Sequence, residues 1–530
     1  MQAQTTLKSF TPDSATFFDE MEQFLTKSRN REGVMVMDDF SWHWGSFSEG
    51  GRKEVYKMAN LMLKKRYRAF PDFKNYLYII SKFVSSGKHN ELDLQEWHKI
   101  AIKLTKSKSK KKFTAYLESC NVLLNENLIY KSKANSWAAN NDNYKFGFDK
   151  IPTIEFDSLT LTCYSKGDSS VIANTKGIYY PTEQKWVGEG GKITWERAGF
   201  AKDSVYATFN NYIIFLKSPK YTIEDVKFYN LKYFDVPLKG VINEKILANV
   251  TTQKASYPKF DSYEAIFSIK DIAKGVDYIG GFSLYGRKVV GRGTAEQDAY
   301  LIFKLKDTPF LKIASKAFLI KPEKIVSQTA SVTFYVENDS IFHPGLSFKF
   351  FVEDRTISMI RDGKGTSITP YINSYHQIDM DFEVLEWKID SPIIEFKNMP
   401  GASVNRARFF SRDYFRLNDY MSLMGTQERH PLYTIKEIVS KLGTTSLTNR
   451  DVSAHTLQSN MRIESMLLYL SNLGFITYNY EAKSFEVKDK LLNWVKASGG
   501  RIDYDVIGFF SSIKSKSNAT LSLLNYDLKM

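Results

Sequence analysis

The spacing of apolar residues changes twice along this chain, and these changes constrain its fold more than any motif does. Phe17, Met21 and Leu25 stand four positions apart, which is typical of an amphipathic helix. Later, apolar and polar residues alternate, as at 154–161 and 341–351, which is typical of half-buried strands. Helical spacing then returns near the C-terminus. Because 530 residues are too many for one core, the sequence predicts several domains.

The first part of the chain predicts a helical domain over residues 1–145, built as a bundle or a short solenoid. Thr11, Pro12 and Asp13 form a helix start, and Asp93 with Glu96 is expected to form a capping box. Short polar joints separate successive stretches and favour antiparallel helix pairs. The expected helices after the first cover residues 54–67, 73–84, 93–104 and 113–124.

The middle of the chain predicts an antiparallel all-β region over residues 146–410. Turn-forming residues at 135–143 are expected to mark its start, and glycine turns separate its strands. Many short strands with such turns are typical of a sandwich or a β-roll, and two such units would fit in this length. The clearest alternating stretches are 154–161, 204–209, 329–336 and 341–351.

Residues 411–497 predict a small helical domain. Three helices are expected, followed by two short strands that form a hairpin, and the segment 470–476 before the hairpin resembles that of winged-helix folds. The expected helices are 434–442, 449–456 and 462–473, and the expected strands are 476–478 and 484–487.

A DNA-reading third helix should offer cationic or amide side chains to base edges. This helix offers Arg462 and Asn460 at its start, and then Glu464 and mostly apolar residues. The sequence therefore favours a protein-interaction module, with nucleic-acid binding as the alternative.

Residues 498–530 are expected to begin a further β domain that this sequence truncates. Residues 519–529 alternate like a strand, and their expected hairpin partner is 502–511. The fold class predicted for the whole chain is multidomain α+β: a helical domain, a β-rich region, a winged-helix-like domain and the start of another β domain.

No group of residues in the sequence has the spacing that catalysis or metal binding requires, so we assign no catalytic, cofactor-binding or metal residues and no cofactor. The seven histidines are scattered. Three clusters are interpreted structurally: the aromatic cluster 42–44 as packing rather than a carbohydrate platform, the loop 286–293 as a basic β-turn rather than a phosphate cradle, and Asp379, Asp381 and Glu383 as an exposed acidic row rather than a glycosidase pair.

The chain carries a net charge of +14, and part of this charge lies in two lysine tracts. Such tracts are typical of solvated surface, although nucleic acid, anionic lipid or acidic glycan could also bind them. Cys120 and Cys163 are expected in different domains, and the sequence leaves open whether they pair. The tract lysines are Lys103, Lys106, Lys108, Lys110, Lys111, Lys112, Lys514 and Lys516.

The N-terminal residues 1–6, MQAQTT, are what remains around many cleaved signal peptides, although an ordinary polar N-terminus would also read this way. No apolar run is long enough to span a bilayer. Three segments, 190–207, 278–294 and 339–351, resemble stretches of large uncharacterised exported proteins of Gram-negative bacteria. The resemblance implies a periplasmic or outer-envelope location and a chain that continues beyond this sequence.

These observations favour a non-enzymatic scaffold or interaction protein of the cell envelope, in which a β-groove could carry a lipid or another ligand. The expected partners are other envelope proteins or the remainder of a longer chain, with lipid or glycan as further candidates. The first alternative is a nucleic-acid-binding protein, and the second is a carbohydrate-binding or carbohydrate-active protein.

Overall fold

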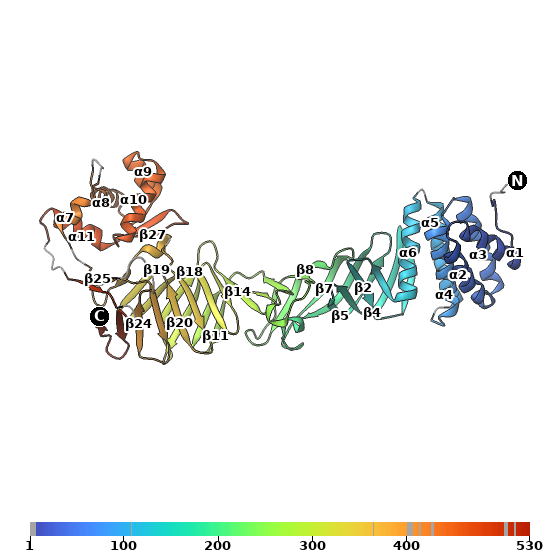
Figure 1. Ribbon diagram of the computed structural model, residues 1–530, viewed down its shortest axis with the longest axis horizontal. Helices are drawn as coiled ribbons and strands as arrows, with labels where there is room; N and C mark the ends of the chain where they lie inside the picture. The colour runs from blue at the N-terminus through green and yellow to red at the C-terminus, as the bar shows by residue number, and fades with distance from the viewer. Residues whose placement is uncertain are drawn as a thin grey trace. The chain divides into compact units, whose positions relative to one another are not determined.

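The computed structural model describes residues 7–88, 90–107, 109–363, 365–399, 406–412, 415–425, 429–502, 507–513 and 516–530 (Figure 1). The chain divides into two compact units. Unit 1 comprises Met1–Tyr263 and Leu284–Arg287, and unit 2 comprises Glu264–Ser283 and Lys288–Met530. The first six residues, on which the expected leader cleavage rests, lie outside the described residues. The boundaries between the four predicted domains stay predictions.

Unit 1 begins with the helical region that the sequence predicts. Its helices are α1 (Ser14–Thr26), α2 (Asn30–His43), α3 (Glu49–Lys64), α4 (Lys74–Ser85), α5 (Glu91–Lys106) and α6 (Lys110–Glu126). The sequence analysis did not predict α2, which carries Gly33 in its first half. Glycine disfavours helix, but here a Cβ would lie 2.8 Å from the backbone nitrogen of Thr26, so Gly33 lets α2 approach the end of α1.

Two helix starts differ from their predicted residues. Asp13, not Thr11, caps α1, because its carboxylate accepts a hydrogen bond from the Thr16 N–H at 3.1 Å. The capping box of α5 joins Asn90 to Asp93 instead of Asp93 to Glu96. Each of these side chains satisfies a backbone N–H that the first helical turn leaves without a partner.

The rest of unit 1 is antiparallel β-structure. Its strands are β1 (Leu128–Lys131), β2 (Asn135–Ala139), β3 (Tyr144–Asp149), β4 (Ile151–Ser165), β5 (Asp168–Tyr180), β6 (Lys185–Thr194), β7 (Val205–Phe215), β8 (Lys220–Asn230), β9 (Leu238–Lys245), β10 (Lys259–Ser262) and most of β13 (Ser283–Tyr285). Strands β4 to β10 pair in chain order, except that β13 also pairs with β10.

The turn-rich segment 135–143, expected to mark the start of the β region, is in part a strand. It contains β2, in which Trp137 pairs with Cys163 of β4 and is completely buried. The turn-forming preference of its asparagines is overridden because pairing with β4 buries the large Trp137 side chain.

Unit 2 contains a second set of antiparallel strands. They are β11 (Phe267–Ala273), β12 (Val276–Gly280), β14 (Lys288–Arg292), β15 (Ala299–Leu305), β16 (Thr308–Ser315), β17 (Ala317–Ile320), β18 (Lys324–Val336), β19 (Asp339–Phe351), β20 (Thr356–Ile360), β21 (Tyr371–Asn373), β22 (Ile378–Asp381), β23 (Val384–Lys388), β24 (Ile393–Lys397), β25 (Ala407–Ser411), β29 (Gly508–Ser511), β30 (Ala519–Ser522) and β31 (Leu528–Lys529). The alternating stretches at 329–336 and 341–351 are therefore confirmed as strands.

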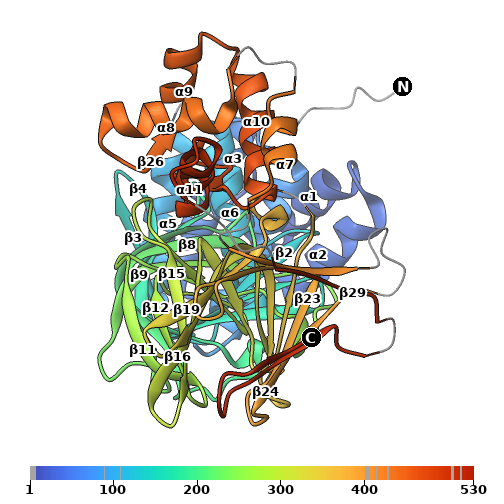
Figure 2. The same cartoon turned by 90° about the vertical axis from the view of Figure 1, so that its left-hand side faces the viewer.

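The long hairpin β18–β19 carries two branches of unit 2. Irregular pairing between Ser327 and Val332 separates one half of β18, which pairs with β16, from the other half, which pairs with β17. Strand β19 is divided in the same way between β20 and β21. Strands β16 and β23, which belong to different branches, are labelled in Figure 2. Aromatic side chains of the two branches pack together, as where Phe310 of β16 meets Trp387 of β23. The interior is filled with side chains at these positions.

The strands near the C-terminus do not form the predicted hairpin. Strand β29 pairs with β25, while β30 pairs with β24 and β31. Residues 508–511 and 519–522 therefore extend two separate edges of unit 2. Pairing with an existing sheet edge satisfies more backbone groups than an isolated two-stranded hairpin would.

Between β25 and β29 lies a helical segment, here called the C-terminal module. It comprises α7 (Leu417–Ser422), α8 (Pro431–Leu442), β26 (Ser446–Thr448), α9 (Asn449–Thr456), α10 (Asn460–Asn472), β27 (Ile476–Asn479), β28 (Ser484–Val487) and α11 (Asp489–Ser498). The three helices and two hairpin strands that the sequence predicts here are confirmed. The strands form their own sheet in the order β26-β28-β27 over an apolar core.

Among the described residues, no helix is both long enough and apolar enough to cross a membrane.

Candidate functional site

A recess in unit 2, here called the wing cleft, is lined by residues of strands β14 and β16 to β19 and of the β27–β28 hairpin of the C-terminal module. Its volume is about 1340 Å³. The helix η5 (Gly365–Ile368) lies beside the same hairpin and completes one wall. A recess of this size could hold a ligand with a long apolar part, so its lining is a candidate binding site.

Strand register builds an apolar floor in the wing cleft. Val290 of β14 pairs with Leu319 of β17, and Leu319 pairs with Val326 of β18. Directly paired residues share a sheet face, so these three side chains lie side by side. All three are half-buried, as are Phe342 and Pro344 on the neighbouring strand β19, which also line the cleft.

Lysines border this floor. Lys349 of β19 pairs with Val326, while Lys321 and Lys324 close the turn between β17 and β18 through a 2.9 Å backbone hydrogen bond. Among the described residues, neither Lys324 nor Lys349 forms an ion pair, and Lys321 has only a distant one, 3.9 Å from Glu323. The turn end of the cleft therefore carries positive charge that the chain itself does not neutralise.

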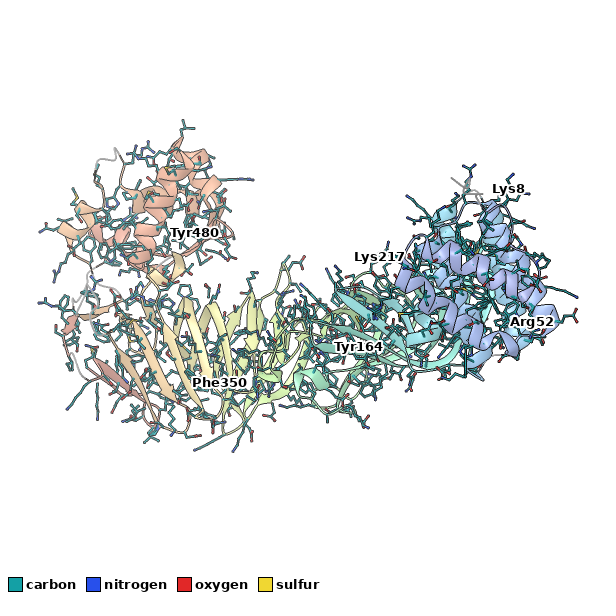
Figure 3. The ribbon with its side chains drawn as sticks, turned by 45° about the vertical axis from the view of Figure 1, so that its right-hand side comes forward. Lys8, Arg52, Tyr164, Lys217, Phe350 and Tyr480 are labelled. Atoms are coloured by element: carbon teal, nitrogen blue, oxygen red, sulfur yellow. The ribbon has the colours of Figure 1, made fainter. Side chains whose placement is uncertain are left out.

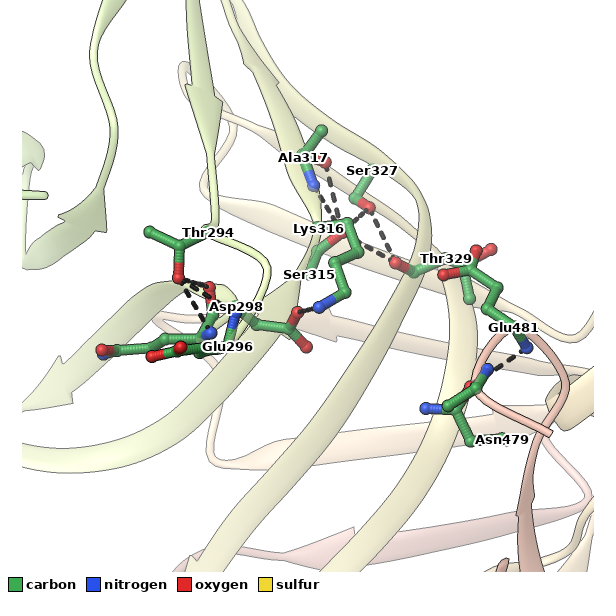
Figure 4. Close-up of polar contacts among 12 residues, drawn as sticks. Thr294, Glu296, Asp298, Ser315, Lys316, Ala317, Ser327, Thr329, Asn479 and Glu481 are labelled. Carbon is green, nitrogen blue, oxygen red and sulfur yellow. Dashed lines mark hydrogen bonds and ion pairs between the residues drawn. The ribbon is translucent and has the colours of Figure 1, made fainter. Parts of the chain in front are cut away.

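Several polar groups in the rest of the lining already have partners within the chain. Lys316 reaches the Asp298 carboxylate at 3.0 Å, and the buried Ser315 and Ser327 hydroxyls lie 2.7 Å apart (Figure 4). Both hydroxyls also lie within 3.1 Å of the Thr329 carbonyl oxygen, so one hydrogen donates to it and the other stays between the serines. These groups hold the corner of the hairpin β18–β19 and are less free to bind a ligand.

A buried polar seam joins the C-terminal module to the strands of unit 2. The Lys490 ammonium lies 3.3 Å from the Asp379 carboxylate and donates to the Leu473 carbonyl at 3.0 Å. Beside it, the Thr369 and Ser471 hydroxyls lie 2.8 Å apart. Because partners for these buried groups come from both sides, the seam fixes one docking position of the module.

This seam corrects the predicted exposed acidic row. Asp379 is only 5% exposed because the module covers it, and Asp381 bonds to Arg361 and Arg408. Glu383 follows the end of β22 and accepts a hydrogen bond from the Met399 N–H. These acids hold structural contacts, and the nearby Glu386 of β23 pairs with Lys397 at 2.7 Å.

Lys488, at the start of α11, is the exception to this pairing. Its carbon stem is partly exposed, but its ammonium nitrogen is inaccessible and has no hydrogen-bond partner among the described residues. Burial lowers the pKa of Lys488 to about 7; Lys490 and Arg412 act in the same direction, and Asp379 opposes them. Half of these side chains are therefore uncharged near neutral pH.

The exposed face of α10 carries two large apolar side chains among polar ones. Met461 is 82% exposed and Tyr469 is 52% exposed, with Ser465 between them at helical spacing, and Leu457 just before α10 is 91% exposed. Arg462 remains exposed beside Met461. Apolar side chains exposed in one row are typical of a protein-binding surface.

The hairpin that follows α10 has little free positive charge. The Lys483 ammonium pairs with Glu464 at 2.7 Å and lies 3.7 Å from the ring centre of Tyr480, whose place at the hairpin is labelled in Figure 3. Glu481 and Glu486 add negative charge near the hairpin. This surface would repel a phosphate backbone more than it attracts one.

Unit 1 contains a buried charge network. The Arg197 guanidinium lies 2.9 Å from both Asp168 and Glu244, and Glu244 is only 1% exposed. Burial raises the pKa of Glu244, and the neighbouring Arg197 opposes this shift. Because Arg197 contacts both acids at once, it links strands of unit 1 and has the character of a structural tie.

A second, smaller recess of about 570 Å³ lies in unit 1 at the turns 132–136 and 164–169. It is lined by Tyr164, which is 49% exposed, and by Asp168 of the charge network (Figure 3). Its remaining lining consists mainly of turn residues. Its charged residues are Asp168, which Arg197 holds, and the exposed turn residues Lys133 and Lys166.

The aromatic cluster 42–44 divides between packing and exposure. Trp44 is buried, donates to the Ser14 hydroxyl and stacks with Phe17 at 6.0 Å, while Arg52 lies 5.5 Å from its ring (Figure 3). Trp42 is 84% exposed. The packing interpretation therefore holds for Trp44 alone.

The first lysine tract lies on the surface of α5 and α6. Lys103 lies 4.8 Å from the ring centre of Phe148, and Lys110 lies 5.9 Å from that of Tyr67. Each ring thus already has a lysine beside it and is not a free stacking platform. Lys108 and Lys514, also expected to be tract members, lie outside the described residues.

The histidines have separate structural roles. His98 donates to or accepts from Tyr76 at 3.1 Å, and burial lowers the pKa of His98 to about 4. His343 is fully buried, donates to the Thr369 carbonyl and accepts from the Gly345 N–H. His89 lies outside the described residues. No group of three or more histidine, cysteine or acidic side chains among the described residues could hold a metal ion.

The two cysteines and the loop 286–293 are also defined by the structure. Cys120 and Cys163 are both free and buried. The loop 286–293 is a tight turn followed by strand β14, in which Gly286 has a φ of +57° and a Cβ there would lie 2.0 Å from the Ala255 carbonyl oxygen. The basic β-turn interpretation is confirmed for this loop.

Comparisons with protein-family models, with curated proteins and with solved structures found no match to this chain. The wing cleft and the α10 face are features that sequence reasoning missed. The signal for the cleft was present in part, as the lysines that flank alternating strands, but strand pairing was needed to bring them together.

Proposed function

We propose that this chain is a non-enzymatic interaction or scaffold protein of the bacterial cell envelope. In this proposal the antiparallel strands of each unit form a sandwich or β-roll that serves as the framework, and the helical segments provide docking surfaces for other envelope proteins. The envelope location rests on the resemblance of three segments to exported proteins. The docking role rests on the surface of α10.

The proposal takes the C-terminal module as a winged helix. The order α8, β26, α9, α10, β27, β28 and the three-stranded sheet β26-β28-β27 are typical of that fold. In such a fold α10 occupies the position of the DNA-reading helix. Its character therefore decides between a protein partner and a nucleic acid.

The exposed apolar side chains of α10 are the observation that carries the docking role. Met461 and Tyr469 occupy the outward row where a DNA reader would carry arginine, lysine, asparagine or glutamine. Lys483, the nearest cation of the hairpin, is engaged by Glu464. Desolvating Met461 and Tyr469 against a protein partner is favourable, whereas placing them in a DNA groove leaves base edges without hydrogen-bond partners.

Site-specific cross-linking in the native cell tests the proposal. A photoreactive amino acid at position 461 or 469 should give light-dependent adducts of defined mass in the envelope fraction. The same amino acid at position 524, where Leu524 is 82% exposed on a turn of unit 2, should give none. Absence of adducts from both α10 positions would overturn the docking role.

Nucleic-acid binding is the alternative that the same protein can test directly. We expect no binding of a random-sequence duplex at low salt by fluorescence anisotropy. A cytoplasmic protein that binds the duplex, loses affinity steeply with salt and weakens on Arg462→Ala would reverse the assignment.

A further inference from the structure

The wing cleft has two kinds of surface in contact with each other, and this combination limits what can bind. Val290, Leu319 and Val326 form a continuous apolar floor. Lys324 and Lys349 stand at the end of this floor without an ion pair among the described residues. A ligand that satisfies both surfaces has an extended apolar part and a negatively charged group at one end.

We propose that the wing cleft binds an acyl chain that carries an anionic headgroup, with the chain on the Leu319–Val326 floor and the headgroup at Lys324 and Lys349. This inference does not depend on the docking role of α10. It assigns to the chain a ligand class in addition to a protein partner.

Charge complementarity favours this occupant over an acidic peptide or a glycan. Only one end of the cleft carries unpaired lysines, because Lys316 is neutralised by Asp298 and the hairpin side contributes Glu481. An acidic peptide would bring several negative charges, of which those near Glu481 would be repelled. A glycan would leave the half-buried valine and leucine side chains without apolar contacts.

The cleft also offers enough apolar length. Phe342 and Pro344 on β19 continue the apolar lining toward the β27–β28 hairpin, where Tyr478 and Tyr480 also line the cleft. Tyr480 is 49% exposed, so its ring is available to a ligand as well as to Lys483. Each methylene that the floor buries should strengthen binding by about fourfold at most, which corresponds to about 0.8 kcal/mol.

Binding of a fluorescent fatty acid to the full-length chain tests the inference. We expect saturable binding of the probe and displacement of the probe by saturated carboxylates, with affinity rising from eight to sixteen carbons. The methyl esters of the same acids should compete at least about tenfold less well, since they lack the charge that the lysines bind.

Two matched double variants identify the site. Lys324→Ala with Lys349→Ala should weaken binding of the carboxylate about tenfold and leave that of the ester unchanged. Lys270→Ala with Lys388→Ala removes two exposed lysines of unit 2 that lie outside the cleft, and should leave both unchanged. Leu319→Gln should weaken both ligands. Circular dichroism melting of each variant confirms that it is folded.

Three outcomes would overturn the inference. One is the absence of probe binding. Another is equal binding of acid and ester together with no effect of the Lys324 and Lys349 changes. The third is binding of a polyglutamate peptide or an acidic oligosaccharide that depends on these lysines while the fatty acid does not bind, which would replace the acyl ligand with that class.

Discussion

At the scale of single residues, buried charged groups differ in whether they have partners. Most of those described above do, but the Lys488 ammonium does not. Arg197 contacts both Asp168 and Glu244, and Lys490 is held by Asp379 and a carbonyl. Lys488 has neither a hydrogen-bond acceptor among the described residues nor water around its ammonium nitrogen. Its charged form is therefore destabilised in the folded chain.

The buried Lys488 is expected to make the stability of unit 2 depend on pH. The pKa of Lys488 is about 7 in the folded chain and has its ordinary value of 10.5 in the unfolded chain, so between these values the unfolded chain binds more protons. The buried lysine therefore destabilises the folded chain fully below about pH 7, and stability increases as pH rises above 7. Lys488→Met should remove this slope and stabilise unit 2 at pH 7 by about 1–2 kcal/mol.

Urea unfolding between pH 7 and 8.5 measures the effect, in a window below the ordinary titration of tyrosine. Lys496→Met is the matched control, because Lys496 is exposed on the same helix, and its slope should equal that of the unchanged chain. Equal slopes for Lys488→Met and the unchanged chain would show that Lys488 stays protonated in the folded chain over this pH range.

A residue's contacts could be predicted from the sequence only where its partner lies a few positions away. The cap of α5 was expected within a few residues of its true position, because Asn90 and Asp93 contact the backbone beside them. The burial of Asp379 was not predictable, because Lys490 lies 111 positions away and brings the module that covers it. Contacts between sequence neighbours can be predicted from the sequence, whereas burial by a segment far away in the chain cannot.

At the scale of elements, periodicity identified the strands but not their partners. The alternation at 329–336 and 341–351 indicates strands whichever neighbours they have, since one face of each is buried. The division of β18 between β16 and β17 depends on the bulge near Ser327, for which alternation gives no signal. The misassigned partner of residues 519–522 has the same cause.

Gly286 gives an element-level prediction. Its turn places β13 beside the segment at Ala255, and both its positive φ and the 2.0 Å approach exclude a side chain. Gly286→Ala should destabilise unit 1 by at least about 2 kcal/mol in urea unfolding.

Gly167→Ala is the control for the backbone effect alone. Gly167 also has a positive φ, +78°, in the turn between β4 and β5, but a Cβ there would meet nothing within 4 Å. It should cost only about 1 kcal/mol. Equal costs at the two glycines would show that the segment at Ala255 moves aside and that the close approach adds no strain.

At the scale of the whole molecule, the division into two units does not follow the order of the chain. Leu284–Arg287 belongs to unit 1, although the residues before and after it belong to unit 2. Leu284 is 1% exposed, and the Tyr285 hydroxyl donates to Asp261 at 2.6 Å. A simple cut of the chain after Tyr263 therefore removes part of the core of unit 1.

Fragments of different length test this exchange. A fragment ending at residue 287 should be more stable than one ending at 263 by about 2 kcal/mol, the amount expected for burying a leucine side chain. A fragment ending at residue 280 adds length without Leu284–Arg287 and should match the shorter one. The same unfolding midpoint for the fragments ending at 263 and 287 would contradict the assignment of this segment to unit 1.

The sequence by itself determined the type of most elements and their order: an N-terminal helical region, antiparallel strands, and a small helical segment with a hairpin. It could do so because helix and strand periods, turns and caps are set by residues a few positions apart. Only the tertiary structure decided that residues 135–139 pair as a strand, that Asp379 is covered, and that Leu319, Val326 and Lys349 share one cleft. Those outcomes depend on contacts between residues far apart in the chain, whose register a local pattern does not encode.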